Sequence, residues 1–178
     1  MNIAGVTAVA LALGLAPLHA KAETLPAPLG PASDGKAQCY EPNRAAKTCN
    51  ALARYERGAG GQILNPAVLM IATKPLITMT TVTAVVVTGG QVCGVARSQD
   101  IDHAEFNVDG TPATPEQTSR LRQGVAKAEA GIFGKQICTT YVPQGDVLLA
   151  KATIDGVAQA GQQQVIWVSS KDGFSVGP

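Results

Sequence analysis

The chain has 178 residues, with 14 basic and 13 acidic side chains and a formal net charge of +1. A balance so close to neutral argues against a nucleic-acid-binding protein, because such proteins need a basic surface to displace the counterions of the phosphates. The length fits one ordinary domain that is large enough to bury a hydrophobic core.

The first 22 residues have the pattern of a secretory signal peptide. An apolar run over 3–18 is followed by the small-x-small sequence Ala20-Lys21-Ala22, after which we expect cleavage. The alternative is an uncleaved anchor, but the run is shorter than the roughly 20 residues of a membrane-spanning helix and contains Gly14 and Pro17. We therefore expect a bacterial protein that is exported to the periplasm or beyond, with no membrane span in the mature chain.

The segment that follows, 23–37, is rich in proline and glycine, so we expect a flexible arm there and a single globular domain over 38–178. Within the domain, 45–55 has a weak helical pattern that ends at a run of glycines. Strands are expected over 67–73, 77–88 and 91–97. Gly89 and Gly90 join the last two, since glycine accepts the positive φ angles of a tight hairpin.

All four cysteines lie after the expected cleavage site, and an even number in an exported chain indicates disulfides. Four cysteines allow three pairings. We favour Cys39 with Cys49, which closes a short local loop, and Cys93 with Cys138, whose strand-like segments flank the clearest helix. The spacing has no C-x-x-C, which argues against a zinc knuckle or a thioredoxin-like redox motif.

That helix begins after Thr114, where Thr114 and Gln117 form a capping box and Pro115 occupies the first turn. Leu121 and Val125 begin an apolar stripe at helical spacing. Three further strands are expected over 135–142, 147–154 and 164–169. The order of three strands, one helix and three strands predicts an α+β fold, in which a largely antiparallel sheet of about six strands, stapled by disulfides, carries the helix on one face.

The acidic segment 100–116 is the one candidate for a metal site. Four of its residues occupy positions 1, 3, 5 and 12 of a calcium-loop template: Glu105, Asn107, Asp109 and Glu116. Pro112 and the strand-like residues before the loop depart from that template. We therefore expect a turn with solvated acids and no metal or other cofactor.

His103 is the only histidine after the expected cleavage site, and its neighbours Asp100 and Asp102 are able to orient an imidazole. The sequence has no G-x-S-x-G or H-E-x-x-H motif to accompany such a base. We expect a surface histidine and no catalytic residues.

Two functions remain from the sequence. The first is an exported, non-enzymatic domain with a binding, inhibitory or envelope-associated role, whose partner is a protein or a small molecule that the sequence does not identify. The alternative is a calcium- or metal-dependent module or hydrolase that uses the segment 100–116. We favour the first, because small disulfide-stapled domains commonly act through loops held on a rigid frame.

Overall fold

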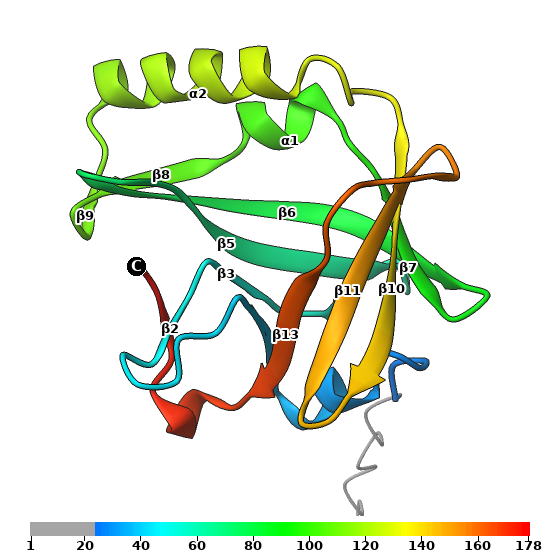
Figure 1. Ribbon diagram of the computed structural model, residues 1–178. Helices are drawn as coiled ribbons and strands as arrows, with labels where there is room; N and C mark the ends of the chain where they lie inside the picture. The colour runs from blue at the N-terminus through cyan, green and yellow to red at the C-terminus, as the bar shows by residue number, and fades with distance from the viewer. Residues whose placement is uncertain (1–23) are drawn as a thin grey trace, which may run out of the picture.

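The structure, a computed structural model, describes residues 24–178 (Figure 1). The expected signal peptide, 1–22, lies outside the described residues. Strands take up 48% of the described residues and helices 18%, so the protein is mainly β, and the expected α+β class is wrong.

The strands in chain order are β1 (Ala37–Tyr40), β2 (Thr48–Cys49), β3 (Ala51–Ala53), β4 (Glu56–Arg57), β5 (Ile63–Thr73), β6 (Leu76–Thr88), β7 (Gln91–Val95), β8 (Glu105–Val108), β9 (Thr111–Pro112), β10 (Gln136–Gln144), β11 (Val147–Ile154), β12 (Val157–Ala158), β13 (Gln163–Val168) and β14 (Ser175–Val176). The helices are η1 (Gly30–Asp34), α1 (Ser98–Asp102), α2 (Pro115–Glu129) and η2 (Ser170–Asp172).

Eight strands close into an antiparallel barrel. The order of pairing is β5-β3-β1-β13-β11-β10-β7-β6, and β6 pairs again with β5. Each barrel strand lies beside the barrel strand that follows it in the chain, as in an up-and-down barrel. The six strands expected from the sequence are all present as β5, β6, β7, β10, β11 and β13. They do not form an open sheet, because β1 and β3 bridge its two edges.

The helix expected over 45–55 is wrong. This segment contains β2 and β3, and Leu52 of β3 pairs with Cys39 on one side and with Val68 on the other. A three-residue strand is too short to show alternation in the sequence. Its conformation is fixed by hydrogen bonding to both neighbours, which overrides a weak helical pattern.

The turn at Gly89-Gly90 is confirmed. Their φ angles are +55° and +76°, and Thr88 and Gln91 pair across the hairpin. Positive φ at two consecutive residues is strained for side chains with a Cβ, so glycine suits both positions.

Helix α2 begins as the sequence predicts. The backbone N–H of Gln117 donates to Thr114 Oγ1 at 3.3 Å, and the N–H of Thr114 donates to Gln117 Oε1 at 2.8 Å. The helix does not cover one face of an open sheet, however. It lies with α1 across one end of the barrel (Figure 1), where Leu121 and Val125 pack on a small cluster that contains Phe106.

The opposite end of the barrel is sealed by the segment 24–36, which includes η1 (Figure 1). Leu25 and Leu29 are 5% and 0% exposed, and they pack with Tyr55, Ile63 and Val92. The sequence suggested an arm with little structure here. The two leucines instead bury their side chains in the end of the barrel, which is a favourable position for apolar groups.

Both disulfides join the pairs that the sequence favoured. Cys93 and Cys138 are direct neighbours on β7 and β10, with their Cα atoms 4.0 Å apart. Cys39 and Cys49 connect β1 with β2, with a Cα separation of 5.4 Å, beneath the small two-stranded sheet of β2 and β14. The residues before and after each barrel cysteine face the interior, so both bonds lie outside the barrel wall.

Candidate functional site

The barrel encloses a cavity of about 310 Å³ between β5, β6, β7, β10 and the two helices. Its inward positions hold small side chains where a filled barrel would have large ones, among them Ala67, Thr81 and Gly94. At Gly94 the wall is closely packed, because an added Cβ atom would lie 3.3 Å from Val85 Cγ1; the open space lies beside the other small side chains. Eight-stranded barrels are either filled by side chains or hold one small ligand, and this barrel is incompletely filled.

A second cavity of about 390 Å³ adjoins the first on the side of β1, β3 and β5. The two have four lining residues in common, Tyr40, Asn65, Ala67 and Leu69. We call the two cavities together the lumen. Each has a size near the lower end of the roughly 300–1,000 Å³ typical of small-molecule sites.

The sealed end of the lumen is lined by three tyrosines that converge on Gln38, and we call these four residues the tyrosine floor. Gln38 is fully buried. Its Oε1 accepts from the hydroxyls of Tyr40 at 3.0 Å, Tyr55 at 2.9 Å and Tyr141 at 3.0 Å. The Tyr40 and Tyr141 hydroxyls are also within hydrogen-bond distance of each other, at 2.6 Å. Because each phenol has a single proton, this contact competes with the bonds of these two hydroxyls to Gln38. The cluster links β1, β10 and the residues after β3 across the barrel.

Burial governs the acid–base chemistry of the tyrosine floor. Desolvation, with a smaller contribution from the neighbouring phenols, raises the pKa of Tyr40 and Tyr55 well above the usual value of a tyrosine. Both hydroxyls therefore remain protonated at neutral pH. Gln38 Nε2 has no hydrogen-bond partner among the described residues, and a buried donor in that state is unfavourable for stability.

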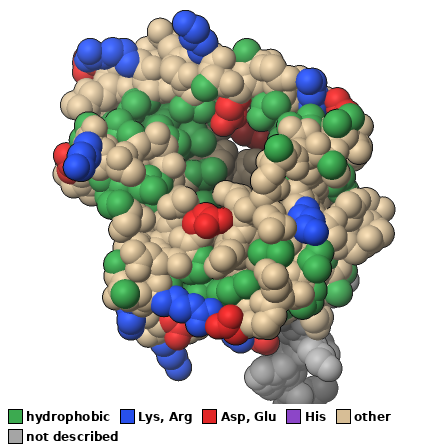
Figure 2. Space-filling model, viewed as in Figure 1, with side chains coloured by type: hydrophobic (Ala, Val, Ile, Leu, Met, Phe, Trp, Pro, Cys, Tyr) green, Lys and Arg blue, Asp and Glu red, His purple; other side chains and the backbone are tan. Residues whose placement is uncertain are grey.

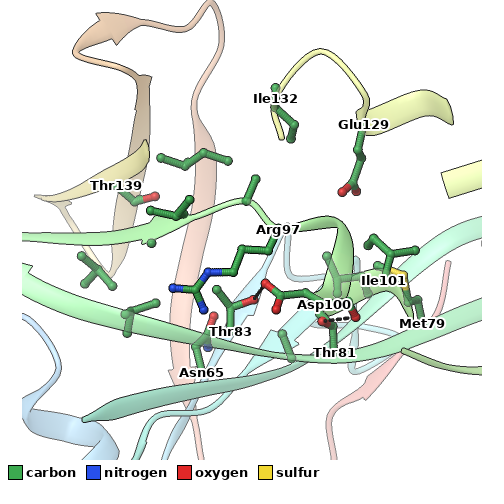
Figure 3. A pocket seen from close by; sticks show the side chains of 18 of the residues that line it. Asn65, Met79, Thr81, Thr83, Arg97, Asp100, Ile101, Glu129, Ile132 and Thr139 are labelled. Carbon is green, nitrogen blue, oxygen red and sulfur yellow. Dashed lines mark hydrogen bonds between the residues drawn. The ribbon is translucent and has the colours of Figure 1, made fainter. Parts of the chain in front are cut away.

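The other end of the lumen carries three charged side chains, Arg97, Asp100 and Glu129, which we call the charged mouth (Figure 3). Asp100 Oδ2 accepts a hydrogen bond from Thr83 Oγ1 at 3.3 Å, and its main-chain oxygen accepts one from Thr81 Oγ1 at 3.5 Å. These two bonds fix α1 against the inner face of β6.

Arg97 and Glu129 differ from Asp100, because neither side chain has a hydrogen bond or an ion pair with any residue of 24–178. The Glu129 carboxyl is half-buried at the end of α2, and desolvation raises its pKa. In the space-filling view the surface is hollowed beneath the helices, and acidic side chains lie at the edge of the hollow (Figure 2). The mouth therefore presents charges of both signs to the lumen.

The calcium-loop candidates lie apart from this site. Glu105 is exposed on β8, where Asn107 pairs with Thr78 of β6, and Glu116 is exposed in the first turn of α2. Asp109 Oδ1 accepts from the backbone N–H of Leu76 at 2.9 Å, which gives this side chain a role in the turn. Over 24–178, no group of three or more histidine, cysteine or acidic side chains is arranged to hold a metal ion.

Of the other candidates from the sequence, only Asp100 lies at the lumen. His103 and Asp102 are exposed at the end of α1, whereas Asp100 belongs to the charged mouth. Sequence reasoning missed Arg97, Glu129 and the tyrosine floor. A signal was present in β6, where threonines at alternate positions, Thr81 and Thr83, occupy the inward side of a strand that the sequence assigned to the core.

Among the described residues, no helix has the length and apolar character needed to cross a membrane. No family model, no curated protein and no solved structure matches this chain.

Proposed function

We propose that this is an exported, non-enzymatic binding protein that holds one small, largely apolar molecule in the lumen of its barrel. The observation that carries the proposal is the lumen itself: a closed barrel, sealed at one end by Leu25 and Leu29, whose inward side chains leave a cavity of about 310 Å³. Ligand sites in proteins are typically concave, mostly apolar and supplied with a few polar groups.

The lining suits a ligand with an apolar body. Val85, Val92 and Ile137 line the cavity with apolar side chains, and the two valines belong to the cluster at its sealed end. An apolar group that leaves water for this space gains roughly 25 cal/mol for each Å² of surface it buries. The hydroxyls of Thr81 and Thr139 add polar contacts around the wall without a net charge.

The chemistry of the floor supports binding more than catalysis. A general base has to be largely deprotonated near its working pH. Burial holds Tyr40 and Tyr55 in their neutral form far above neutrality, so these hydroxyls are suited to hydrogen bonding and not to proton abstraction. The two disulfides are consistent with an extracellular or periplasmic location, and export by the segment 1–22 is part of the proposal.

Binding of a neutral apolar fluorophore, N-phenyl-1-naphthylamine, tests the proposal. We expect one molecule to bind per protein, with the fluorescence increase of an apolar environment. Ala67→Phe fills the lumen from β5 and should abolish binding, whereas Val82→Phe, on a side chain of β6 that is 49% exposed, should leave it unchanged.

Ala67→Leu is a smaller second variant in case Ala67→Phe does not fold, since overfilled interiors are often destabilised. It should weaken binding in a protein whose circular dichroism is unaltered. Absence of binding to the unmodified protein, or equal binding by a folded Ala67 variant, would overturn the proposal.

A further inference from the structure

The charged mouth brings charges of opposite sign to a single cavity. Arg97, Asp100 and Glu129 all line the same cavity, and no ion pair joins any two of them. Elsewhere on the surface, Arg44 and Asp146 form such a pair at 2.6 Å. At the mouth, the guanidinium of Arg97 and the carboxylate of Glu129 are both left without a partner from 24–178.

The signs of these charges restrict the ligand. A purely anionic ligand would find one arginine but would also face two carboxylates. A purely cationic ligand would find the carboxylates but would face the arginine. A ligand that carries an ammonium and a carboxylate on one carbon atom satisfies both groups, because guanidinium forms charge-assisted hydrogen bonds with carboxylates and carboxylates accept them from ammonium groups.

We infer that the lumen binds a zwitterionic α-amino acid with an apolar side chain, its carboxylate on Arg97 and its ammonium group between Asp100 and Glu129. This inference rests on the proposed function and specifies the chemical class of its ligand. The apolar side chain then extends down the lumen, among Val85, Val92 and Ile137.

The environment of Glu129 agrees with this assignment. Its pKa is raised by desolvation, and no neighbouring cation offsets that effect. A bound ammonium group supplies the missing positive charge and favours the ionised carboxylate. Asp100 is already held in place by Thr83, so one carboxylate of the pair is oriented before the ligand arrives, which reduces the entropy lost on binding.

The experiment compares three ligands with the same phenyl ring by isothermal titration calorimetry at pH 7. L-Phenylalanine carries both charges, 3-phenylpropanoate carries only the carboxylate, and phenethylamine carries only the ammonium. We expect phenylalanine to bind at least about tenfold more tightly than either analogue, the size of one charge-assisted hydrogen bond.

Two variants test which protein side chain binds each charged group of the ligand. Arg97→Gln should weaken the binding of phenylalanine by about tenfold without weakening the binding of phenethylamine, which has no carboxylate. Glu129→Gln should weaken the binding of phenylalanine without weakening that of 3-phenylpropanoate, which has no ammonium group. Matched controls are Arg54→Gln and Glu105→Gln, both at exposed positions outside the lumen. Each control should bind phenylalanine as the unmodified protein does.

The outcomes separate the two proposals. If the naphthylamine binds in the lumen but phenylalanine does not, or if all three phenyl ligands bind equally, the zwitterion assignment is wrong and the binding function stands. If neither the naphthylamine nor any phenyl ligand binds, the proposed function fails and this inference fails with it.

Discussion

The two ends of the barrel are built on opposite principles. At the sealed end, Leu25 and Leu29 pack into an apolar cluster, and the tyrosine floor above them has all three hydroxyls hydrogen-bonded. At the charged mouth, the side chains of Arg97 and Glu129 have no hydrogen-bond or ion-pair partner within 24–178. Both ends belong to the same eight strands, so the difference comes from the segments that cover them.

This contrast separates stability from function. Buried apolar surface and the hydrogen bonds of the three tyrosine hydroxyls stabilise the sealed end, although Gln38 Nε2 there has no partner among the described residues. The charged mouth contributes less, because Arg97 is exposed to water and the half-buried carboxylate of Glu129 has no partner, which is unfavourable. Binding sites often retain groups that lower the stability of the fold, because these groups interact with the ligand. Changes at the sealed end should therefore alter the free energy of unfolding, and changes at the mouth should alter binding.

The largest effect is expected from the disulfide that joins β7 to β10 on the outside of the barrel wall. Cys93 and Cys138 enclose the residues that carry α1 and α2, and their sequence separation is 45. In the chain-entropy model, replacing both by alanine lowers the free energy of unfolding by about 4 kcal/mol. Replacing Cys39 and Cys49, whose separation is 10, should cost about 3 kcal/mol. Urea unfolding of the two double variants measures both losses of stability. A larger loss in the Cys39 and Cys49 variant than in the Cys93 and Cys138 variant would contradict this prediction.

Leu29→Ala tests the sealed end directly. The side chain is fully buried, and its truncation leaves a cavity, so the free energy of unfolding should fall by about 3 kcal/mol. The matched variant is Leu121→Ala at the other end, where Leu121 is a half-buried residue of α2. It should lower the free energy of unfolding by about 1 kcal/mol. Equal losses in urea titrations of the two variants would remove the distinction between the ends.

Alkaline pH should also act on the sealed end. Burial raises the pKa of Tyr40 and Tyr55 in the folded protein, while in the unfolded chain tyrosine titrates near its ordinary value of about 10. Below that pH both states are protonated and these groups contribute full stability. Above it the unfolded chain alone loses protons, so stability falls by up to about 1.4 kcal/mol per pH unit for each tyrosine.

Urea midpoints measured from pH 8 to 11 record this loss, and Tyr55→Phe provides the control. The variant lacks one of the two shifted phenols, so its stability should decline less steeply above pH 10. An identical decline in both proteins would show that the tyrosine floor does not cause the alkaline sensitivity.

The smallest effect on folding is expected at the mouth. Desolvation raises the pKa of Glu129, so its ionised form is slightly unfavourable in the folded protein. Glu129→Gln should therefore raise the free energy of unfolding at pH 7 by no more than about 0.5 kcal/mol, since water screens a half-exposed group. The gain should vanish as the pH falls below about 4, where both states hold the carboxyl protonated. A loss of stability at pH 7 would indicate a partner for Glu129 in solution.

The sequence alone determined the local elements. Strand-like segments bounded by turn residues located six barrel strands, Gly89-Gly90 fixed a hairpin, and the Thr114 capping box fixed the start of α2. The spacing of the cysteines favoured the two pairs that the structure contains. These features depend on residues close together in the chain, whose conformational preferences can be read locally. The signal peptide remains a prediction.

Closure of the barrel and assembly of the site were decided only by the tertiary structure. Strands β1 and β3 have four and three residues, too few for a periodic pattern, and they become strands because both their edges are hydrogen-bonded. The Tyr40 and Tyr141 hydroxyls meet across 101 residues of sequence. Contacts of this kind are selected by the free energy of the whole barrel, since the pairing of distant strands and the burial of their side chains leave no signature in any local stretch.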